Sequence, residues 1–292
     1  MGTATNFKRI HSFKTVCITG GAGSLGSELV RILLQSSTAI VRVLDNSEGN
    51  LGRLRSRFIV QESRLRWFHK DIRDLYEIKR AVEGVDLVIH AAALKHIWLG
   101  QYNPKSVKSV NVDGTQNVID ACMDERNVQV CISVSTDKAV NPTSFYGQSK
   151  AMAEGLVLNA NRMKGDRPTA FSVYRPCNFF LSSGNVVEKW RDQIEAGASI
   201  TLTRGDMRRY YIGTGRAAEL LLKAAMSAEG GDIWIPKAKE YSISELAELF
   251  GGEIQIVNGE EGEKRREELY TEEEVKFMRD EGDMWCIRRP TL

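Results

Sequence analysis

The first half of the chain alternates short apolar runs with amphipathic stretches. Apolar runs rich in β-branched residues cover 15–19, 40–44, 65–69, 85–90, 128–134 and 169–174. Stretches with a helical spacing of apolar positions lie between them, at 25–35, 75–82, 104–124 and 146–163. Strands that are buried on both faces are apolar throughout, and helices connect parallel strands. The pattern therefore predicts an α/β fold, a Rossmann-type doubly wound parallel sheet.

The alternation weakens after residue 177, which indicates a second, smaller part of the chain. Helices are predicted at 215–228 and at 241–250, the latter capped by Ser242 or Ser244. The charged run 260–274 is expected to be a solvated helix face. We predict a Rossmann domain over 12–176, with 212–234 returning to it, and a C-terminal substrate-binding part from 177–211 and 235–292.

Composition excludes several classes of protein. The chain has 292 residues, of which 42% are hydrophobic and 27% charged, as in ordinary globular proteins. A net charge of +2 gives no reason to expect nucleic acid or an anionic membrane as partner. The N-terminal stretch lacks a signal-peptide core, and no run of about 18 apolar residues occurs. We expect a cytoplasmic protein. The cysteines and histidines have no zinc-like spacing, so no metal is expected.

The clearest local motif is a glycine-rich turn. Gly20, Gly23 and Gly26 follow the first predicted strand and open the first predicted helix. Glycines permit a tight turn and let backbone N–H groups approach a pyrophosphate, at a helix end that carries partial positive charge. Ser24 and Leu25 lie in the same turn. We predict that these five residues bind the phosphates of a dinucleotide.

An acidic residue at the end of the second predicted strand indicates which dinucleotide. Asp45 can accept hydrogen bonds from the adenine-ribose hydroxyls, and its charge repels a 2′-phosphate, so NAD is favoured over NADP. Asn46 follows it, and the alternative is a turn made by this pair. Arg53 or Arg55 would instead select NADP.

Asp71 and Ile72 lie at the end of the third predicted strand. This position places them at the carboxyl edge of the sheet, where the adenine is expected. The alternative is that Asp71 makes a turn or caps a helix. We assign both residues to the cofactor site.

Tyr146 and Lys150 form a YxxxK motif at the start of a predicted helix. Their spacing puts both side chains on one helix face. Lys150 can hold the cofactor ribose while its ammonium lowers the pKa of the Tyr146 phenol. The phenolate can then take a proton from a substrate hydroxyl while hydride leaves the same carbon.

Thr136, Asp137 and Lys138 leave the strand predicted at 128–134 at its carboxyl end, where ligands bind in open α/β sheets. Oxidation of a hydroxyl needs one hydroxyl side chain here, and Thr136 supplies it. A neighbouring acid and base suit a dehydration. Once the hydroxyl on C4 of the substrate has become a ketone, the C5 proton is acidic. Lys138 then removes this proton, and Asp137 protonates the C6 hydroxyl, which leaves as water. The two groups would titrate as one coupled pair. The alternative is a surface ion pair in a turn.

Together these segments resemble the UDP-N-acetylglucosamine 4,6-dehydratases of the extended short-chain dehydrogenase superfamily. The resemblance lies in STDKAVNPTSFYGQSKAMAE (135–154), TGGAGSLG (19–26), HAAALKH (90–96), NVDGTQNVIDA (111–121) and RPCNFFLSSGNVV (175–187). It continues more weakly through DMRRYYI (206–212) and GEKRREEL (262–269). The short spacing from Thr136-Asp137-Lys138 to Tyr146 is specific to this family.

The resemblance implies further site residues and partners. Cofactor contacts are implied for Ala91, Ala92 and Ala93, substrate contacts for Lys95, His96 and Asn178, and contacts near the uridine diphosphate for Arg209 and Glu263. Lys95, Arg209 and Glu263 have the alternative of being solvated charges. The family also implies a homo-oligomer and a UDP-N-acetylhexosamine substrate.

The chain departs from the family pattern at a few positions. Asp45 to Glu48 resembles the membrane-anchored, C5-retaining members, whereas Tyr146 and the absence of transmembrane helices resemble the C5-inverting members. Cys177 replaces the usual glycine, and Glu260 stands where the family has arginine, a role that Lys264 or Arg265 could take. Both stereochemical outcomes at C5 therefore stay open.

The sequence thus predicts an NAD-dependent lyase that converts UDP-N-acetylglucosamine to a 4-keto-6-deoxy sugar for surface glycans. A UDP-hexose 4-epimerase is the first alternative, and Lys138 argues against it because epimerisation needs no such base. A non-catalytic dinucleotide sensor is the second. Such a sensor would need none of the residues Asp137, Lys138, Tyr146 and Lys150.

Overall fold

The computed structural model describes residues 12–37, 39–180, 182, 184–259 and 262–289. The expectation about the N-terminal stretch falls on residues 1–11, which lie outside the described residues. Glu260 also lies outside them.

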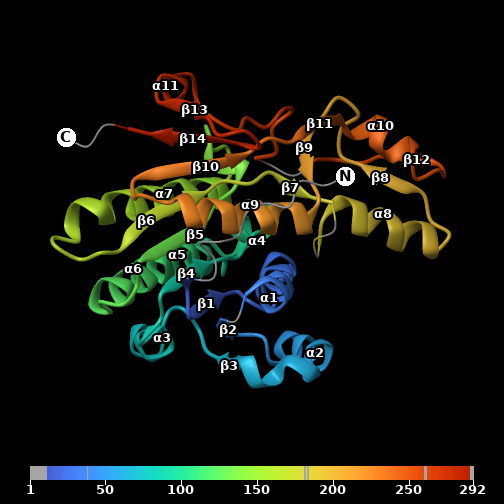
Figure 1. The fold of residues 1–292 in the computed structure, drawn as a ribbon. Helices are drawn as coiled ribbons and strands as arrows, with labels where there is room; N and C mark the ends of the chain where they lie inside the picture. The colour runs from blue at the N-terminus through green and yellow to red at the C-terminus, as the bar shows by residue number, and fades with distance from the viewer. Residues whose placement is uncertain (1–11, 38, 181, 183, 260–261, 290–292) are drawn as a thin grey trace.

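A nine-stranded sheet forms the centre of the molecule, in the order β13-β14-β10-β6-β5-β4-β1-β2-β3 (Figure 1). Its strands are β1 (Thr15–Thr19), β2 (Ile40–Asp45), β3 (Leu65–His69), β4 (Leu87–His90), β5 (Val130–Val134), β6 (Ala170–Tyr174), β10 (Asp232–Pro236), β13 (Met278–Asp280) and β14 (Met284–Arg288). The strands from β3 to β10 pair in parallel, and β13 and β14 add an antiparallel edge. The predicted Rossmann-type α/β fold is confirmed.

Helices cover both faces of this sheet. They are α1 (Ser24–Ser36), α2 (Glu48–Arg57), α3 (Leu75–Val82), α4 (Ile97–Tyr102), α5 (Pro104–Lys108), α6 (Gly114–Asp124), α7 (Phe145–Met163) and α9 (Thr214–Ser227). Helices α1 and α9 pack against each other on one face, and α3, α6 and α7 pack in series on the other (Figure 1).

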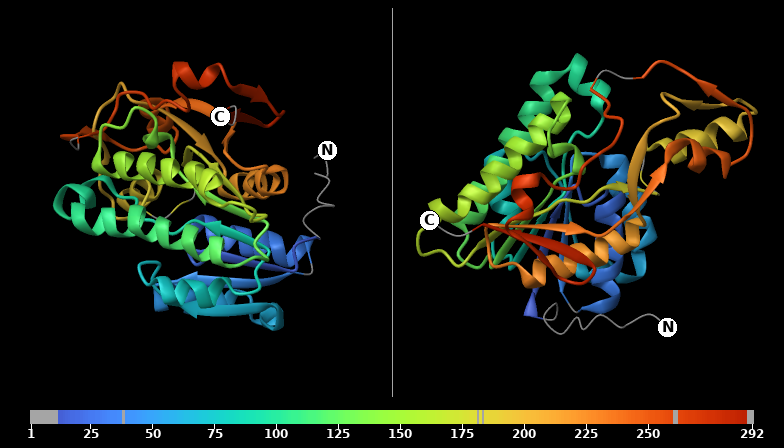
Figure 2. Two further views of the ribbon diagram at one scale, coloured as in Figure 1. Left: turned by 90° about the vertical axis from the view of Figure 1, so that its left-hand side faces the viewer. Right: turned by 90° about the horizontal axis from the view of Figure 1, so that it is seen from above.

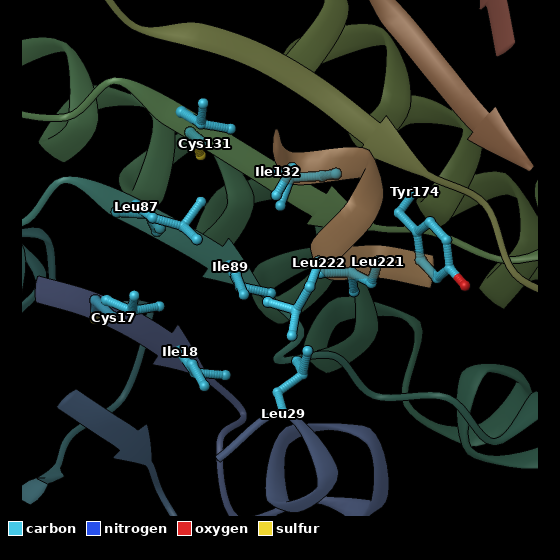
Figure 3. Close-up of a cluster of buried hydrophobic side chains, with 14 of the residues drawn as sticks. Cys17, Ile18, Leu29, Leu87, Ile89, Cys131, Ile132, Tyr174, Leu221 and Leu222 are labelled. Atoms are coloured by element: carbon cyan, nitrogen blue, oxygen red, sulfur yellow. The ribbon is translucent and has the colours of Figure 1, made fainter. Parts of the chain in front are cut away.

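The core lies where α1 and α9 meet the central strands. Figure 3 shows Leu29 of α1 and Leu222 of α9 beside Ile18, Ile89 and Ile132 of β1, β4 and β5. All five side chains are at most 1% exposed. Burying each such side chain stabilises the fold by about 1.5–3 kcal/mol, so this layer holds α1 and α9 against the central strands.

A smaller lobe lies beside the carboxyl edge of the sheet (Figure 2). It contains a sheet of β7 (Asn178–Phe179), β9 (Arg208–Ile212) and β11 (Lys239–Ser242), a pair of β8 (Ile200–Leu202) and β12 (Ile254–Ile256), and the helices α8 (Val186–Glu195) and α10 (Ile243–Glu248). Its separate core is centred on Trp190, which is fully buried. Ser242 caps α10, as predicted, by accepting a hydrogen bond from Glu245 N.

The C-terminal region differs from two expectations. Residues 278–288 were assigned to the substrate-binding part, but β13 and β14 extend the main sheet, because the apolar Met284, Cys286 and Ile287 are buried there. The other boundaries of the two predicted parts remain predictions.

The run 260–274 was expected to be a solvated helix face, and this prediction is wrong. Within 262–274 only the start of α11 (Glu272–Val275) is helical, and Glu267 and Glu274 are buried. Cations from other elements, the half-buried Lys138 and the buried Arg175, pair with these two carboxylates, so a charge-rich sequence does not mean a solvated one.

The helix predicted at 104–124 is present but is interrupted by a π-helical turn at Ser109–Asp113. Asn111 in this turn is fully buried and exchanges hydrogen bonds with the backbone of Leu94 at 2.8 and 2.9 Å. It also donates to Ser149 on α7 at 3.0 Å. π-turns often occur at functional sites, and this one ties the loop after β4 to α7.

Candidate functional site

The glycine turn has the geometry of a phosphate cradle. Gly20 has φ +65°, and a Cβ there would lie 2.7 Å from backbone atoms of Ala92. A Cβ on Gly26 would lie 2.5 Å from the Gly20 carbonyl oxygen, and Gly23 N donates to the same oxygen at 3.1 Å. The N-terminus of α1 follows at Ser24. Side chains at Gly20 and Gly26 would collide with the backbone of Ala92 and of the turn itself, so only glycine permits this tight turn. A glycine turn that leads into a helix N-terminus fits a pyrophosphate.

Asp45 lies directly beside this turn. Its buried carboxylate accepts hydrogen bonds from Ala22 N at 3.1 Å and from Ser47 N at 2.9 Å. Each oxygen keeps lone pairs that can accept from a ribose hydroxyl, so the turn role and the ribose role are compatible. The arginines proposed for NADP selection already have partners. Arg53 donates to Asn50 within α2, and Arg55 pairs with Glu62 in the 3₁₀ turn that follows it.

Asp71 and Ile72 have different surroundings from each other. Asp71 pairs with Arg73 at 2.6 Å, and this hydrogen bond holds the pKa of the carboxyl below its usual value. Ile72 is buried against Gly114, where a Cβ would meet its side chain at 2.7 Å. Asp71 thus makes a turn after β3, and the contacts of both residues with adenine remain a prediction.

Tyr146 and Lys150 are both buried on α7. Ser144 caps this helix by accepting a hydrogen bond from Gly147 N at 3.1 Å. Lys150 Nζ donates to the carbonyl oxygen of Val134, at the end of β5, at 2.8 Å. Burial lowers the pKa of Lys150 to about 8, so its amine loses its proton more easily than that of an ordinary lysine.

The Tyr146 phenol has a raised pKa, contrary to the expected lowering by Lys150. Burial raises it, and the Lys138 charge and a hydrogen bond with Thr136 act in the opposite direction. The lysine that lowers the Tyr146 pKa is therefore Lys138, in the turn before α7, and not Lys150, one helical turn further along α7.

Asp137 and Lys138 form a largely buried pair rather than a surface one, with 0% and 19% of their side chains exposed. They lie in the 3₁₀ turn η4 (Asp137–Ala139), and Lys138 Nζ is 3.0 Å from Asp137 Oδ1. Thr136 Oγ1 donates to the same oxygen at 2.9 Å. Asn178 on β7 accepts from Lys138 Nζ at 3.2 Å. Asp137 is completely buried, so the alternative of a solvated pair is wrong.

The Lys138 side chain is held as an ammonium in this arrangement. Burial acts to lower its pKa, but the Asp137 and Glu267 carboxylates outweigh burial, and the pKa is raised well above that of an ordinary lysine. The charged pair is therefore the resting form, and the neutral pair that a dehydration needs is a form of higher energy.

The structure brings Arg209 close to this pair. Its guanidinium is buried and donates to the carbonyl oxygens of Lys264 at 2.7 Å and Arg265 at 3.2 Å. The alternative of a solvated Arg209 is therefore wrong. Glu263, half-buried, precedes this segment. Lys264 Nζ donates to the Val140 carbonyl oxygen, so it is turned toward the turn after η4.

Lys95 and His96 lie in the loop between β4 and α4. The Lys95 side chain is exposed and His96 is half-buried. Partial desolvation lowers the pKa of both side chains. His96 packs against Gly184, where a Cβ would lie 2.6 Å from the imidazole ring. The two residues therefore lie between the sheet and the start of the smaller lobe.

Sequence reasoning missed two buried carboxylates that contact this region. Glu267 lies 3.8 Å from Lys138 Nζ. Glu274 pairs with Arg175 at 2.9 Å, and Arg175 also pairs with Glu154 on α7 at 2.7 Å. Glu267 and Glu274 lie in the charged run 260–274, whose charge density indicated solvent exposure.

Comparison with known proteins places the chain in a family. Residues 16–289 match the family described as polysaccharide biosynthesis protein. The chain is 42% identical to the "Uncharacterized membrane protein MJ1061" of Methanocaldococcus jannaschii, over 96% of this chain and 88% of that protein. No helix among the residues that the structure describes is long and apolar enough to span a bilayer.

Two named enzymes are also similar over most of their length. The chain is 34% identical to a UDP-N-acetylglucosamine 4,6-dehydratase (inverting) of Campylobacter jejuni, and 32% identical to a UDP-glucose 4-epimerase of Rickettsia prowazekii. Each comparison covers 94% of this chain and 82% of the relative.

Solved structures show the same fold. The structure of Pen from Bacillus thuringiensis has a TM-score of 0.92 at 33% identity, covering 95% of this chain and 90% of that one. That of DesIV from Streptomyces venezuelae, a dTDP-glucose 4,6-dehydratase, has a TM-score of 0.79 at 23% identity, with 90% of each chain covered. The chain therefore belongs to the polysaccharide biosynthesis protein family, within the extended short-chain dehydrogenases.

Proposed function

We propose that this protein is a UDP-N-acetylglucosamine 4,6-dehydratase that uses NAD. The observation that carries the proposal is the buried Asp137–Lys138 pair, 3.0 Å apart at the carboxyl end of β5. A buried acid and base next to a Tyr-Lys motif match the needs of an elimination that follows oxidation of a hydroxyl. The similar Campylobacter enzyme supports this choice of reaction.

The glycine cradle and Asp45 fit the cofactor. Gly20, Gly23 and Gly26 would hold its pyrophosphate, and Asp45 would accept from the adenine ribose. Lys150, now bonded to the Val134 carbonyl oxygen, would hold the nicotinamide ribose. When bound, this cofactor would supply the acceptor for the hydride from C4 of the sugar and the donor for its return to C6.

Tyr146 is proposed to remove the proton from the C4 hydroxyl, with Thr136 orienting the sugar oxygen. The 4-ketone makes the C5 proton acidic. Lys138 first passes a proton to Asp137 across their 3.0 Å contact, which creates a neutral amine and a carboxylic acid. The Lys138 amine then takes the C5 proton, and Asp137 gives its proton to the C6 hydroxyl, which leaves as water.

The substrate would lie between the sheet and the smaller lobe. Asn178 already contacts both Asp137 and Lys138, so it can guide the sugar ring. Lys95 and His96 are proposed to flank the sugar, and Arg209 and Glu263 to lie near the uridine diphosphate. The bidentate geometry of arginine suits a diphosphate.

The test is direct. Purified protein is incubated with NAD and UDP-N-acetylglucosamine, and the nucleotide sugar is weighed by mass spectrometry. We expect a product lighter by one water, and no such product with Lys138→Ala. A product of unchanged mass but altered C4 configuration would overturn the proposal.

A UDP-hexose 4-epimerase is the second candidate, because the Rickettsia relatives carry that name at 31–32% identity. An epimerase also needs Tyr146 and Lys150, but not a buried base beside them. Epimerisation should therefore survive Lys138→Ala, whereas dehydration should not. A dinucleotide sensor would release neither product.

Two further expectations belong to this proposal. All five cysteines are buried free thiols, and cytoplasmic conditions keep thiols reduced, which supports a cytoplasmic location. A homo-oligomer is expected from the family resemblance alone, and sedimentation of the purified protein would test it.

A further inference from the structure

Glu267 lies among three cations that come from three separate parts of the chain. Its Oε1 atom is 3.8 Å from Lys138 Nζ of η4 and 4.0 Å from Arg209 Nε of β9. Its Oε2 atom is 3.6 Å from Lys264 Nζ. The residue is only 3% exposed, and Oε2 accepts no hydrogen bond within the part of the chain that the structure describes. A buried carboxylate at this distance acts through its charge.

The Lys138 ammonium can interact with a second carboxylate besides Asp137. An ammonium has three N–H donors, and two of them are directed at Asp137 and Asn178, at 3.0 and 3.2 Å. Glu267 is a second carboxylate near this ammonium, 3.8 Å from Nζ. The carboxylate that sits between Lys138 and Arg209 thus joins the proposed base to the proposed diphosphate end of the site.

We propose that Glu267 is a positioning residue that shares its carboxylate between Lys138 and Arg209, and thereby keeps the Lys138 ammonium beside Asp137 and Asn178. This inference rests on the proposed function for the role of Lys138 as base. It adds a residue from the C-terminal segment, and Glu267 itself exchanges no proton with the substrate.

The charged and titratable groups that face Lys138 come from every element around it. Asp137 and Glu267 favour its ammonium form, and Arg209 opposes it. The side chains of Tyr146, Cys177 and Tyr211 also lie close enough to interact with its charge. Replacing Glu267 by glutamine removes one of the two negative charges that favour the Lys138 ammonium and keeps the shape of the side chain. The neutral amine of Lys138 therefore becomes easier to form.

The experiment measures this amine without any substrate. Wild type and Glu267→Gln are pulsed with acetic anhydride at pH 9, and acetylation of Lys138 is followed by mass spectrometry of its peptide. Only the neutral amine reacts. Loss of an opposite charge about 4 Å away changes a pKa by about 1–3 units, so Lys138 should react roughly 10- to 10³-fold faster in the variant.

Internal and matched controls separate charge from loosening of the site. Lys150 is buried on α7, and its charge responds to Glu154 rather than to Glu267, so its rate should stay within about twofold. Faster labelling of both lysines would mean that the site has opened, which overturns the proposal. Glu268→Gln is the matched variant, because Glu268 is exposed and accepts from Asn141. It should leave both rates unchanged.

A second variant keeps the test usable if Glu267→Gln does not fold. Glu267→Asp keeps the charge but moves it one methylene away, so Lys138 should react several-fold faster, and less than in the glutamine variant. An unchanged Lys138 rate in the folded variant overturns the proposal. Because no substrate is used, this failure is distinct from failure of the proposed function, which shows as a wild type that releases no dehydrated sugar.

Discussion

A Cβ atom on Gly147 would lie 2.3 Å from the carbonyl oxygen of Lys138. Only glycine therefore lets α7, with Tyr146, lie directly against the turn η4, with Asp137 and Lys138. The side chain assigned to oxidation and the pair assigned to elimination owe their proximity to one missing methyl group.

Gly147→Ala should therefore separate the two halves of the site. We expect kcat for dehydration to fall about 10²-fold, because small displacements of reacting groups have large effects. Overpacking should also cost about 1–3 kcal/mol of unfolding free energy. Gly155→Ala is the control on the same helix, since nothing lies within 4 Å of its Cβ position. It should keep full activity and gain up to about 1 kcal/mol of stability, measured by urea unfolding.

Asp45 should set the choice of cofactor. Its carboxylate lies beside the phosphate cradle, so NAD should bind at least about tenfold more tightly than NADP, or about 1.4 kcal/mol. Calorimetric titration with both cofactors gives the ratio. Equal affinities would mean that Asp45 serves only the turn that it makes with Ala22 and Ser47.

Single substitutions should separate the half-reactions. Lys138→Ala should still form enzyme-bound reduced cofactor on adding substrate, because Tyr146 and Lys150 are assigned to oxidation at C4. This step should be slower than in wild type, because the Lys138 charge that lowers the Tyr146 pKa is lost. It should neither exchange the C5 proton in heavy water nor release water. Tyr146→Phe should abolish all three signals. Stopped-flow absorbance and mass spectrometry measure them, and rapid dehydration by Lys138→Ala would favour the epimerase.

Asp137→Asn should slow only the departure of water. The amide keeps the shape but has no acidic proton to donate, so elimination should fall by about 10²–10⁴-fold. Formation of reduced cofactor should persist. If Asp137→Asn also failed to form reduced cofactor, Asp137 would be needed for the structure of the site.

The buried Arg175 should make Glu274 important for stability. Burial acts to raise the pKa of Glu274, but its hydrogen bond to Arg175 prevails and lowers it. Glu274→Ala leaves part of a buried guanidinium unpaired and should cost about 3 kcal/mol at pH 7. Glu272→Ala, in the same turn but exposed, should stay within about 0.5 kcal/mol.

The stability difference between wild type and Glu274→Ala should depend on pH, because the pKa of Glu274 is lowered in the folded protein. Because the pKa of Glu274 is lower in the folded protein than its ordinary value of 4.5, the ionised carboxylate stabilises the protein at pH values above 4.5. This stabilisation is lost as the pH falls through the pKa of Glu274 in the folded protein. The gap between wild type and Glu274→Ala should therefore narrow in acid. A constant gap in thermal melts from pH 7 to acid would show that the loss is one of packing.

The nucleotide-binding half could be predicted because local patterns determine it. The apolar run that became β3 and the amphipathic stretch that became α3 were predicted with the bounds that the structure has. The glycine turn was predictable for the same reason, since Gly23 N bonds to the Gly20 carbonyl oxygen and a Cβ on Gly26 would meet that same oxygen, all within a few residues.

The rest depends on contacts between distant parts of the chain. Glu267 and Lys138 are far apart in sequence, and nothing local distinguishes the buried Glu267 from the exposed Glu268 beside it. The Tyr146 pKa was expected to follow its neighbour Lys150 on the helix. The fold instead brings Lys138 and a low-polarity environment to the phenol, and burial decides the direction.

The antiparallel edge formed by β13 and β14 has a consequence for how the chain folds during its translation. The segment that holds Glu267 and Glu274 leads into this edge, so it leaves the ribosome after nearly all of the site has been made. Until it docks, Arg175 lacks one of its two carboxylates and Lys138 lacks one of its two. A nascent chain that ends at residue 259 should therefore have an incompletely folded site, however complete its glycine turn and central strands.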